Sequence, residues 1–368
     1  MAYVWNQQQD RALKSVIAWI KDRKAKQVFR LFGFAGTGKT TLAQEIANQI
    51  KGMVLFAAYT GKAAIVLKTK GCESASTIHS LIYCFEEDGD GGYQCVLNPN
   101  SKALDAALII IDEGSMVDEV IGKDLLSFGK KVLVLGDPFQ LAPPNGAGFF
   151  TQQEPDIMLT DVERQAKDNP IIALSREIRE GNGLKYGVYG DTKVIRRKDV
   201  RQAEVIEADQ ILVGRNVTRS LYNNRVREIK GFTGTIPGEG ERLVCLRNNR
   251  TNGLLNGSLW DTVSADVCNV NPDAVELTVR SADWDANWEV STLVPRAFFV
   301  GDESKLEWNE LRDRDQFTYG HALTVHKAQG SQWPNVYLFD ESRFFRDQRW
   351  RHLYVGLTRA EKRATVVL

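Results

Sequence analysis

The chain has 368 residues, of which 43% are hydrophobic and 26% charged, an ordinary globular composition long enough for two or three domains. Lys and Arg number 47 and Asp and Glu 47, so the net charge is zero and a general basic coat for nucleic acid is excluded. Five cysteines without a Cys-x-x-Cys pair disfavour a disulfide framework and a zinc site.

The first part of the chain predicts an α/β sheet. An amphipathic helix is expected over Gln7–Ile20. Short apolar runs of strand length follow, each ending in a polar or glycine-rich loop: Val28–Phe32, Met53–Ala58, Leu108–Ile111 and Val132–Leu135. Such runs predict buried parallel strands, whose ligands bind at the carboxyl ends.

Later segments predict two further kinds of structure. Two short strands around a glycine-rich turn predict a hairpin within residues 82–103. Residues 234–310 are rich in Gly, Asn and alternating segments, which predict a small all-β insertion. A second sheet is expected from three apolar runs: Gln210–Val213, Val336–Phe339 and Thr365–Leu368.

The loop after the first apolar run has the pattern of a phosphate-binding loop. Gly33–Thr40 fits G-x-x-x-x-G-K-[ST], follows a strand and opens a helical pattern. Glycines allow backbone N–H groups to turn toward phosphate oxygens, so Gly36, Thr37 and Gly38 are candidate nucleotide ligands. Lys39 would reach the terminal phosphates, and Thr40 would bind Mg²⁺ through its hydroxyl.

The next two strand ends predict the chemistry of hydrolysis. Asp112 would hold Mg²⁺, and Glu113 would polarise the attacking water, which favours hydrolysis over mere nucleotide binding. After the following strand, Gln140 is placed to bring an amide near the terminal phosphate. Without the phosphate loop nearby in the sequence, the Asp-Glu pair would be interpreted as a solvated strand end, and Gly136–Pro138 as a simple turn.

Together these motifs resemble helicase superfamily 1, in the 5′-to-3′ branch that includes the phage Dda helicase and RecD. The resemblance covers nearly the whole chain. It implies that Gln9 contacts the adenine, that Thr60 contacts the nucleic-acid backbone, and that Thr77–Leu81 is diagnostic of the branch. In the second half, Leu159–Gln165, Ala322–Gln332 and Leu353–Ala360 resemble later family motifs.

The later motifs imply two arginine fingers, Arg164 and Arg359, that stabilise charge on the transferred phosphoryl group. Three residues depart from the family pattern. Gln332 replaces a glutamate that contacts the ribose, Glu163 replaces an aromatic beside the adenine, and Gly114 replaces a small side chain, the last with little expected effect.

The implied fold class is α/β, with two RecA-like parallel-sheet motor domains. The expected domains are 1–150 (with the hairpin inserted at 82–103), 151–233 together with 311–368, and the barrel-like all-β insertion 234–310. ATP and Mg²⁺ are the implied cofactors, with Thr40 and Asp112 as metal ligands and Gln332 on the ribose.

The expected activity is ATP-dependent 5′-to-3′ translocation on single-stranded DNA with unwinding of duplexes. Candidate strand contacts are Thr60, His79, Thr324 and His326 for phosphates, and Phe139, Trp260 and Trp333 for base stacking. The alternative for both histidines is a structural role, and the three aromatics could equally be core residues. The hairpin would separate strands, with Tyr83, Phe85 or Tyr93 against the last base pair, unless it only caps its domain.

An RNA helicase of the same superfamily and a nucleotide-dependent binding switch without unwinding stay open as alternatives; a small-molecule kinase is disfavoured by the second set of motifs. Expected partners are single-stranded DNA and duplex junctions, with a single-strand-binding protein or the replisome as protein partners, and the protein is expected to be monomeric. The chain start lacks a signal pattern and no apolar run approaches the roughly 20 residues that span a bilayer. We therefore expect no membrane partner and a cytoplasmic location, in the host if a phage encodes the protein.

Overall fold

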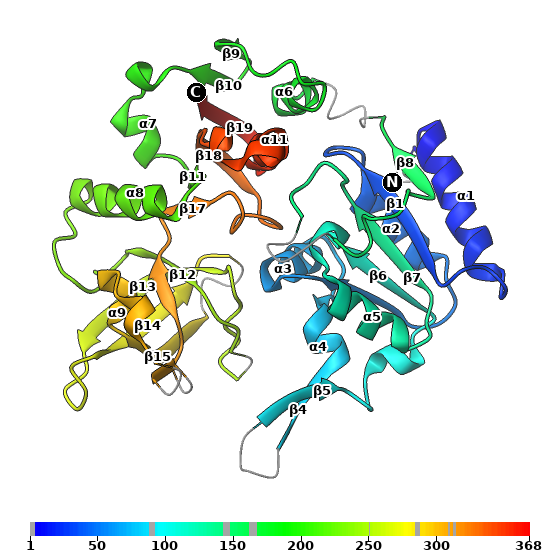
Figure 1. The fold of residues 1–368 in the computed structure, drawn as a ribbon, viewed down its shortest axis with the longest axis horizontal. Helices are drawn as coiled ribbons and strands as arrows, with labels where there is room; N and C mark the ends of the chain where they lie inside the picture. Colours follow the sequence, from blue (N-terminus) through cyan, green and yellow to red (C-terminus); the bar gives the residue numbers. More distant parts are fainter. Residues whose placement is uncertain are drawn as a thin grey trace. The chain divides into compact units, whose positions relative to one another are not determined.

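The structure is a computed structural model that describes residues 4–87, 93–142, 148–161, 168–249, 251–283, 288–307, 310–311 and 314–368. The chain divides into two compact units, Met1–Leu184 and Lys185–Leu368. In each unit helices flank a sheet (Figure 1). No helix in the described ranges is long and apolar enough to cross a membrane.

A six-stranded parallel sheet forms the centre of the first unit, in the order β3-β2-β6-β7-β1-β8. Its strands are β1 Val28–Gly33, β2 Val54–Ala58, β3 Ser76–Thr77, β6 Leu108–Asp112, β7 Val132–Gly136 and β8 Ile157–Leu159. The four strands predicted from apolar runs are confirmed as β1, β2, β6 and β7. Helices cover both faces of the sheet, which explains why these strands are apolar along their length.

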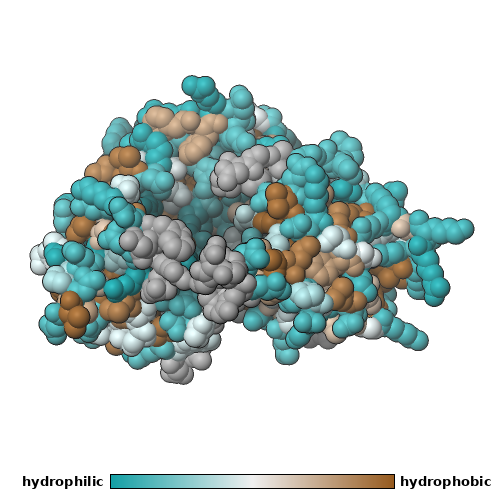
Figure 2. Space-filling view, turned by 60° about the horizontal axis from the view of Figure 1, so that its bottom comes forward, coloured by the Kyte–Doolittle hydropathy of each residue, from teal (hydrophilic) through white to brown (hydrophobic). Residues whose placement is uncertain are grey.

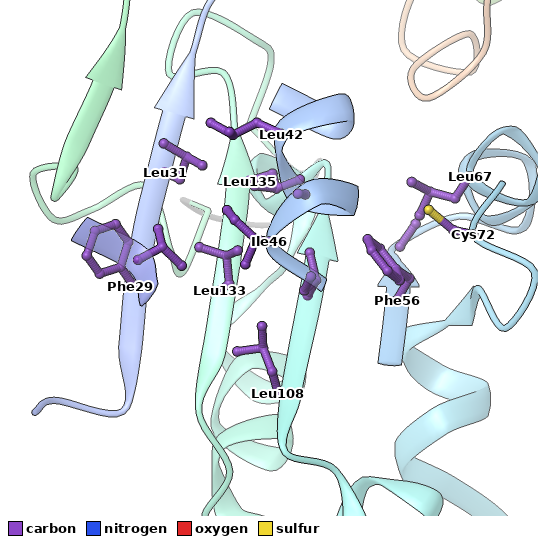
Figure 3. Packing of buried hydrophobic residues seen from close by; sticks show 14 of the residues in the cluster. Phe29, Leu31, Leu42, Ile46, Phe56, Leu67, Cys72, Leu108, Leu133 and Leu135 are labelled. Atoms are coloured by element: carbon purple, nitrogen blue, oxygen red, sulfur yellow. The ribbon is translucent and has the colours of Figure 1, made fainter. Parts of the chain in front are cut away.

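Successive residues of each strand pack on opposite faces of this sheet. The helices are α1 Gln7–Lys21, α2 Lys39–Asn48, α3 Gly61–Thr69, α4 Ile78–Ile82, α5 Glu119–Ser127 and α6 Pro170–Arg179, with short turns η1 Lys102–Asp105 and η2 Gly114–Met116. Leu31 and Leu133 belong to the cluster beneath α1, α2 and α3, and Figure 3 shows Leu42 and Ile46 of α2 beside the strands. Phe32 belongs to the cluster beneath α4 and α5.

The first unit extends further along the chain than the predicted boundary at residue 150. Strand β8 pairs in parallel with β1, Leu31 opposite Ile157 and Gly33 opposite Leu159. The boundary between the units falls after Leu184 instead. A three-residue strand gives too short an apolar run to be recognised in the sequence, and only its pairing with β1 assigns it to this sheet.

The predicted hairpin is present as β4 Tyr83–Glu87 paired antiparallel with β5 Tyr93–Leu97. Its foot is tied to the sheet unit, because Tyr83 Oη donates to Asp124 Oδ2 of α5 at 2.6 Å. The turn 88–92 and the side chains of Phe85 and Tyr93, two of the three predicted strand-separating aromatics, lie outside the described residues.

A second six-stranded sheet, in the order β17-β11-β18-β19-β10-β9, forms the centre of the second unit, with only β9 antiparallel to its neighbour. Its strands are β9 Gly187–Tyr189, β10 Thr192–Ile195, β11 Gln210–Val213, β17 Ala322–Thr324, β18 Trp333–Phe339 and β19 Ala360–Val367. The associated helices and turns are η4 Arg197–Asp199, α7 Gln202–Ile206, α8 Asn216–Ile229, η6 Ser342–Gln348 and α11 Arg349–Leu357. The three strands predicted for this sheet are confirmed as β11, β18 and β19.

The all-β insertion is an antiparallel sheet in the order β15-β14-β13-β12-β16. It consists of β12 Arg242–Cys245, β13 Leu259–Val267, β14 Ala274–Ser281, β15 Glu289–Pro295 and β16 Phe317–Tyr319, with α9 Ala297–Val300 and η5 Glu303–Lys305 after β15. The sheet curls toward closure, because Asp315 N–H donates to Leu293 O at 3.2 Å beside the two edge strands. Strand β16 extends the insertion past the predicted end at residue 310.

Large apolar side chains fill these cores, and a few remain exposed. Val188 and Val217 are among the exposed ones, at 72% and 68% of full exposure. On the face drawn in Figure 2, hydrophobic residues lie in patches between hydrophilic ones. Scattered apolar side chains of this kind are ordinary on a globular surface.

Candidate functional site

The predicted phosphate-binding loop connects β1 to α2 and has the backbone that such a loop requires. Gly36 and Gly38 both have φ of 76°, in the left-handed region that favours glycine. Gly33 must also be glycine, because a Cβ there would lie 2.6 Å from Thr37 Oγ1 and 2.8 Å from Leu159 Cβ. Thr37 is fully buried and its Oγ1 donates to Phe34 O at 2.9 Å, which holds the loop in shape.

Lys39 lies across this loop. Its Nζ donates to Gly33 O at 2.7 Å and to Phe34 O at 2.9 Å. A lysine ammonium has three donors and can exchange carbonyl oxygens for phosphate oxygens without moving its stem. The loop therefore combines a positive charge with the N-terminus of α2, and these residues fit a nucleotide's phosphates.

Asp112 and Thr40 form the candidate magnesium site. Thr40 Oγ1 donates to Asp112 Oδ2 at 3.3 Å, and Glu113 N–H donates to Asp112 Oδ1 at 2.9 Å. Burial, together with the charge of Glu113, raises the pKa of Asp112. No group of three His, Cys, Asp or Glu in the described part of the chain could hold a metal. One carboxylate and one hydroxyl, completed by phosphate oxygens and water, is the oxygen set that Mg²⁺ prefers.

Glu113 follows β6 in an unusual backbone conformation. Its φ of 54° and ψ of 42° are left-handed, which is uncommon for a residue other than glycine and is often found at functional sites. Gly114 comes next, and a Cβ there would lie 2.3 Å from Val134 Cγ1 of β7. A side chain at this position would therefore force Val134 or the turn to shift, so in this structure the glycine allows close packing against β7.

Gln140 is brought to the same edge of the sheet by β7. It is buried, and Ser115 Oγ donates to its Oε1 at 3.4 Å. The loop before it is fixed by Asp137, whose Oδ1 accepts Phe139 N–H at 2.9 Å and whose carbonyl accepts Gln140 N–H at 3.1 Å. Gly136–Pro138 is thus a turn, as the alternative interpretation predicted. This turn also places the Gln140 amide at the edge of the sheet where Asp112 and Glu113 lie. Phe139 is half-buried beside it.

Gln9 packs against the phosphate loop, since its Nε2 donates to Thr37 O at 3.2 Å while its Oε1 accepts Asn6 N–H at 3.0 Å in a capping box. The neighbouring Gln8 accepts hydrogen bonds from Thr160 N–H and Asp161 N–H through its Oε1, at 2.9 and 3.0 Å. It joins α1 to the segment after β8. The next residues, including Glu163 and the predicted finger Arg164, lie outside the described residues.

The first-unit candidates for strand binding lie after β2 and β3. Thr60 caps α3, its Oγ1 accepting Ala63 N–H at 3.2 Å. His79 lies between two tyrosines, with ring centroids 5.8 Å from Tyr59 and 5.9 Å from Tyr83. Burial, and then the bond to Asp124, raises the pKa of Tyr83. Tyr83 therefore anchors the foot of the hairpin and does not present an aromatic at its tip.

In the second unit a hollow of about 410 Å³ opens beside Thr324. Its polar lining includes Asn216, Arg219, Ser220, Glu303, Thr324 and Lys327. Burial lowers the pKa of both Lys327 and Arg219, and Arg219 Nε has no hydrogen-bond partner in the described structure. Sequence reasoning missed both cations, although Lys327 stands inside the motif that carries Thr324.

His326 belongs to a different cluster from Thr324. Its ring centroid lies 5.2 Å from Phe345 and 5.6 Å from His352, and Phe345 stacks on His352 at 4.0 Å. Burial lowers the pKa of His326 and lowers that of His352 to about 3. The His326 imidazole is therefore neutral at pH 7 and can contribute a hydrogen bond, not a charge.

The two tryptophans predicted to stack on bases, both in the second unit, are core residues. Trp260 is completely buried in the β insertion, edge-on to Phe317 with centroids 6.5 Å apart. It cannot stack on a base, and that expectation is wrong. Trp333, 6% exposed, begins β18 beside β19, where its N–H donates to Arg359 O at 2.9 Å.

The predicted finger Arg359 is buried at 4% exposure within its own unit. Its Nε donates to Val355 O at 3.1 Å, its Nη1 to Ser331 O at 3.2 Å and its Nη2 to Thr358 Oγ1 at 3.3 Å. The exposed Gln332 follows Ser331 directly. The fold thus brings together the two late motifs, which stand far apart in the sequence.

Comparisons with known proteins agree with this organisation. The family model for an AAA domain matches residues 4–200, and the model for a UvrD-like helicase C-terminal domain matches residues 319–367. The ATP-dependent RecD2 DNA helicase of Deinococcus radiodurans is 29% identical over 335 residues, which cover 83% of this chain and 42% of RecD2. The chain thus spans less than half the length of that relative.

Solved helicase structures share the fold. A Bacteroides Pif1 helicase in complex with ADP-AlF3 and single-stranded DNA superposes with a TM-score of 0.58 at 18% identity, over 99% of this chain and 92% of that one. The Pif1 helicase of Candida albicans gives 0.57 at 17% identity, over 100% and 94%. These likenesses show a fold of two RecA-like domains.

Proposed function

We propose that this chain, which belongs to the AAA domain family, is an ATP-driven DNA helicase of the 5′-to-3′ branch of superfamily 1. The observation that carries the proposal is the edge of the first sheet. A phosphate loop after β1 and, after β6, a candidate magnesium ligand and a glutamate in a left-handed backbone conformation lie there, at the ends of the two strands that flank β7. This set of groups suits hydrolysis of a nucleoside triphosphate.

In the proposed reaction the loop N–H groups and Lys39 hold the phosphates, while Thr40 and Asp112 hold Mg²⁺. Bound Mg²⁺ supplies positive charge that favours the ionised form of the Asp112 carboxylate. Glu113 accepts the proton of the attacking water, and Gln140 orients that water. Arg359 and Arg164 stabilise the charge of the transition state, with Gln9 at the adenine and Gln332 at the ribose.

We further propose that the DNA strand is held through its phosphates by Thr60, His79 and the Thr324 hollow. The hollow supports this role because it contains two cations in a desolvated setting, where a phosphate would offset their unfavourable burial. His326 would act as a neutral donor. Half-buried Phe139 suits stacking better than the buried Trp333 does.

The finer features of the proposal concern setting and partners. Membership in the branch supports 5′-to-3′ travel, with the β4–β5 hairpin meeting the duplex through Phe85 or Tyr93. The five cysteines are free, which suits the reducing cytoplasm. We propose a monomer that works with single-stranded DNA, duplex junctions and a single-strand-binding protein or the replisome.

Unwinding of 5′-tailed and 3′-tailed duplexes by the purified chain tests the proposal, together with ATP hydrolysis stimulated by DNA or by RNA. We expect unwinding of 5′-tailed duplexes alone and stimulation by DNA. Lys39→Ala should keep the melting temperature and lose both activities, because the hydrogen bonds of Lys39 within the described residues go to carbonyls of its own loop. Unwinding of 3′-tailed duplexes alone would refute the polarity, and stimulation by RNA alone would refute the substrate. Hydrolysis without unwinding would identify a switch.

A further inference from the structure

A second hollow in the second unit lies away from every residue assigned above. It has a volume of about 280 Å³ and opens between the segment that contains η4 and α7 and the latter half of α8. The residues that matter here are Arg197, Val200, Ile206, Tyr222, Arg225 and Phe339. We call this hollow the α7–α8 groove.

The floor of the groove is apolar. The rings of Tyr222 and Phe339 pack with centroids 4.5 Å apart, and Phe339 belongs to the core beneath α8. Val200 and Ile206 pack against the same core and remain partly exposed. The groove is thus an opening in the layer of helices, with room for one or two large apolar side chains.

The rim of the groove is cationic. The segment Arg196–Arg201 contains four basic residues and one acidic residue. Arg197 forms no ion pair within the described ranges, whereas Glu204 is neutralised by Lys193 at 3.4 Å. Arg225 of α8 also borders the groove, but it is paired with Glu228 at 2.8 Å. The groove therefore offers an apolar slot bordered by the positive charge of Arg197, which no ion pair within the described ranges balances.

The groove faces away from the strand hollow. Tyr222, Arg225 and Ile229 form one stripe of α8, whereas Asn216, Arg219 and Ser220 line the hollow beside Thr324. At about 100° per residue these two sets project from different faces of the helix. An occupant of the groove would leave the strand hollow open, so both could be filled at once.

We propose that the α7–α8 groove binds a short acidic peptide of a partner protein, anchored by one or two large apolar side chains. A carboxylate would pair with Arg197, a second could share Arg225 with Glu228, and the anchor would cover Tyr222 and Phe339. The chemistry favours a peptide over a nucleic acid, because Phe339 is only 4% exposed and Tyr222 is partly buried against it, which leaves little open ring face on which bases could stack. It also favours a peptide over a second copy, because the chain as a whole carries no net negative charge.

Fluorescence anisotropy with three labelled probes tests this site on the full chain. The first probe is a short peptide of aspartates and glutamates ending in Leu-Phe, the second ends in Ser-Ser, and the third has amides in place of its acids. We expect the first to bind at least roughly tenfold more tightly than either other probe, because both charge and anchor contribute.

Two variants and a matched control locate the binding. Arg197→Glu should weaken the first probe by about tenfold or more, and Ile229→Ser should weaken it through the lost apolar wall. Lys51→Glu makes the same charge change on an exposed residue of the first unit and should have no effect. DNA-stimulated ATP hydrolysis should stay at the parent level in all three, which separates this proposal from the proposed function.

Several results would overturn the assignment. Equal affinity for the Leu-Phe and Ser-Ser probes would show that the apolar slot binds no anchor and that only the opposite charges attract the peptide. An unchanged affinity in Arg197→Glu would place the binding elsewhere, and because Arg197 is exposed that variant should fold even if Ile229→Ser does not. Displacement of the probe by single-stranded DNA would assign the groove to nucleic acid. Self-association abolished by Arg197→Glu would assign it to a second copy.

Discussion

The two units treat the same structural feature in opposite ways. In each, a buried strand leads through a tight turn into a helix: β1 into α2, and β11 into α8. In the first unit the turn is the phosphate loop, with Lys39 across it. In the second the turn is closed by a carboxylate of the chain, because Glu341 Oε2 accepts Gly214 N–H and Arg215 N–H, both at 2.9 Å.

A helix N-terminus attracts an anion in either unit. The units differ in which anion can lie there: a nucleotide phosphate at α2, and the Glu341 carboxylate at α8. Glu341 is 2% exposed, and its Oε1 also accepts a bond from Thr218 at 2.7 Å. Gly214 lets it approach, since a Cβ there would lie 2.6 Å from Glu341 Cβ. The two sheets therefore differ at corresponding turns. The turn after β1 is available for a nucleotide, whereas the N–H groups of the turn after β11 are bonded to Glu341 of the same chain.

Because the β11–α8 turn is filled by Glu341, the proposed function gives the second unit a different part in hydrolysis, through Arg359. Arg359→Ala should lower turnover by about 10³ or more, the usual value of an arginine finger, while single-stranded DNA binding survives. Steady-state hydrolysis and DNA anisotropy measure the two effects. Because Arg359 is buried, Arg359→Lys serves as a gentler variant, and Arg363→Ala, exposed on β19, as a matched control.

A variant that hydrolyses ATP normally but no longer binds DNA would show that Arg359 belongs to the strand site. Normal hydrolysis with loss of DNA binding in Arg359→Lys would lead to the same conclusion. Loss of folding in both variants would be visible as a lowered melting temperature and would indicate that the three bonds to Val355, Ser331 and Thr358 are the role of this residue.

Glu113, at the edge of the first sheet, should be needed for ATP hydrolysis but not for ATP binding. Glu113→Gln should reduce turnover by about 10² or more, because general-base catalysis contributes that much, and should leave ATP affinity near the parent value. Glu119→Gln, an exposed acid nearby, is the control and should be silent. If affinity fell together with turnover, Glu113 would be a structural residue of this turn.

Replacing the internal anion should cost stability. Glu341→Gln should lower the free energy of unfolding by about 2–3 kcal/mol, the usual worth of hydrogen bonds to a charged group, as measured by urea titration. Burial would raise the pKa of Glu341, but hydrogen bonds from Thr218, Arg215 and Gly214 hold that pKa below its usual value. Glu276→Gln, exposed on β14, is the control.

The pH dependence of this effect has a fixed sign. A carboxyl whose pKa is lower in the folded state stabilises fully above its unfolded pKa of about 4.3 and loses that contribution as pH falls through the folded value. The gap between the parent and Glu341→Gln should therefore be full at pH 7 and shrink below about pH 4. A gap that widened in acid would contradict the assigned charge state.

The turn after Glu113 should tolerate no side chain. Gly114→Ala should lower the free energy of unfolding by about 1–3 kcal/mol, the usual cost of overpacking a core, because its Cβ would meet Val134 Cγ1. Adding Val134→Ala should recover part of the loss, since it removes the clashing atom. Gly187→Ala in β9, where the nearest atom to a new Cβ lies at 3.4 Å, is the control. Additive losses in the double variant would refute the clash.

The smallest expected effect concerns Gln332. Gln332→Glu should lower the KM for ATP by roughly a few-fold, because a carboxylate accepts ribose hydroxyl bonds more strongly than an amide does. Turnover at saturating ATP should stay close to the parent value, which separates binding from chemistry. An unchanged or higher KM would mean that Gln332 does not face the ribose.

The sequence by itself determined the sheets and the nucleotide edge. Apolar runs predicted β1, β2, β6, β7, β11, β18 and β19, and a contiguous motif predicted the phosphate loop. Such features can be predicted because the residues that form them are neighbours in the chain. The residue type also indicates the backbone conformation, as with the positive φ of Gly36 and Gly38.

Only the tertiary structure decided how residues distant in sequence share space. It buried Trp260, drew β8 into the first sheet, placed Val134 against Gly114 and brought Glu341 to the turn after β11. It also set Arg219 beside Thr324 and opened the α7–α8 groove. Each outcome depends on packing between elements dozens of residues apart, and packing at close contact is specified by the whole set of neighbours rather than by any local pattern.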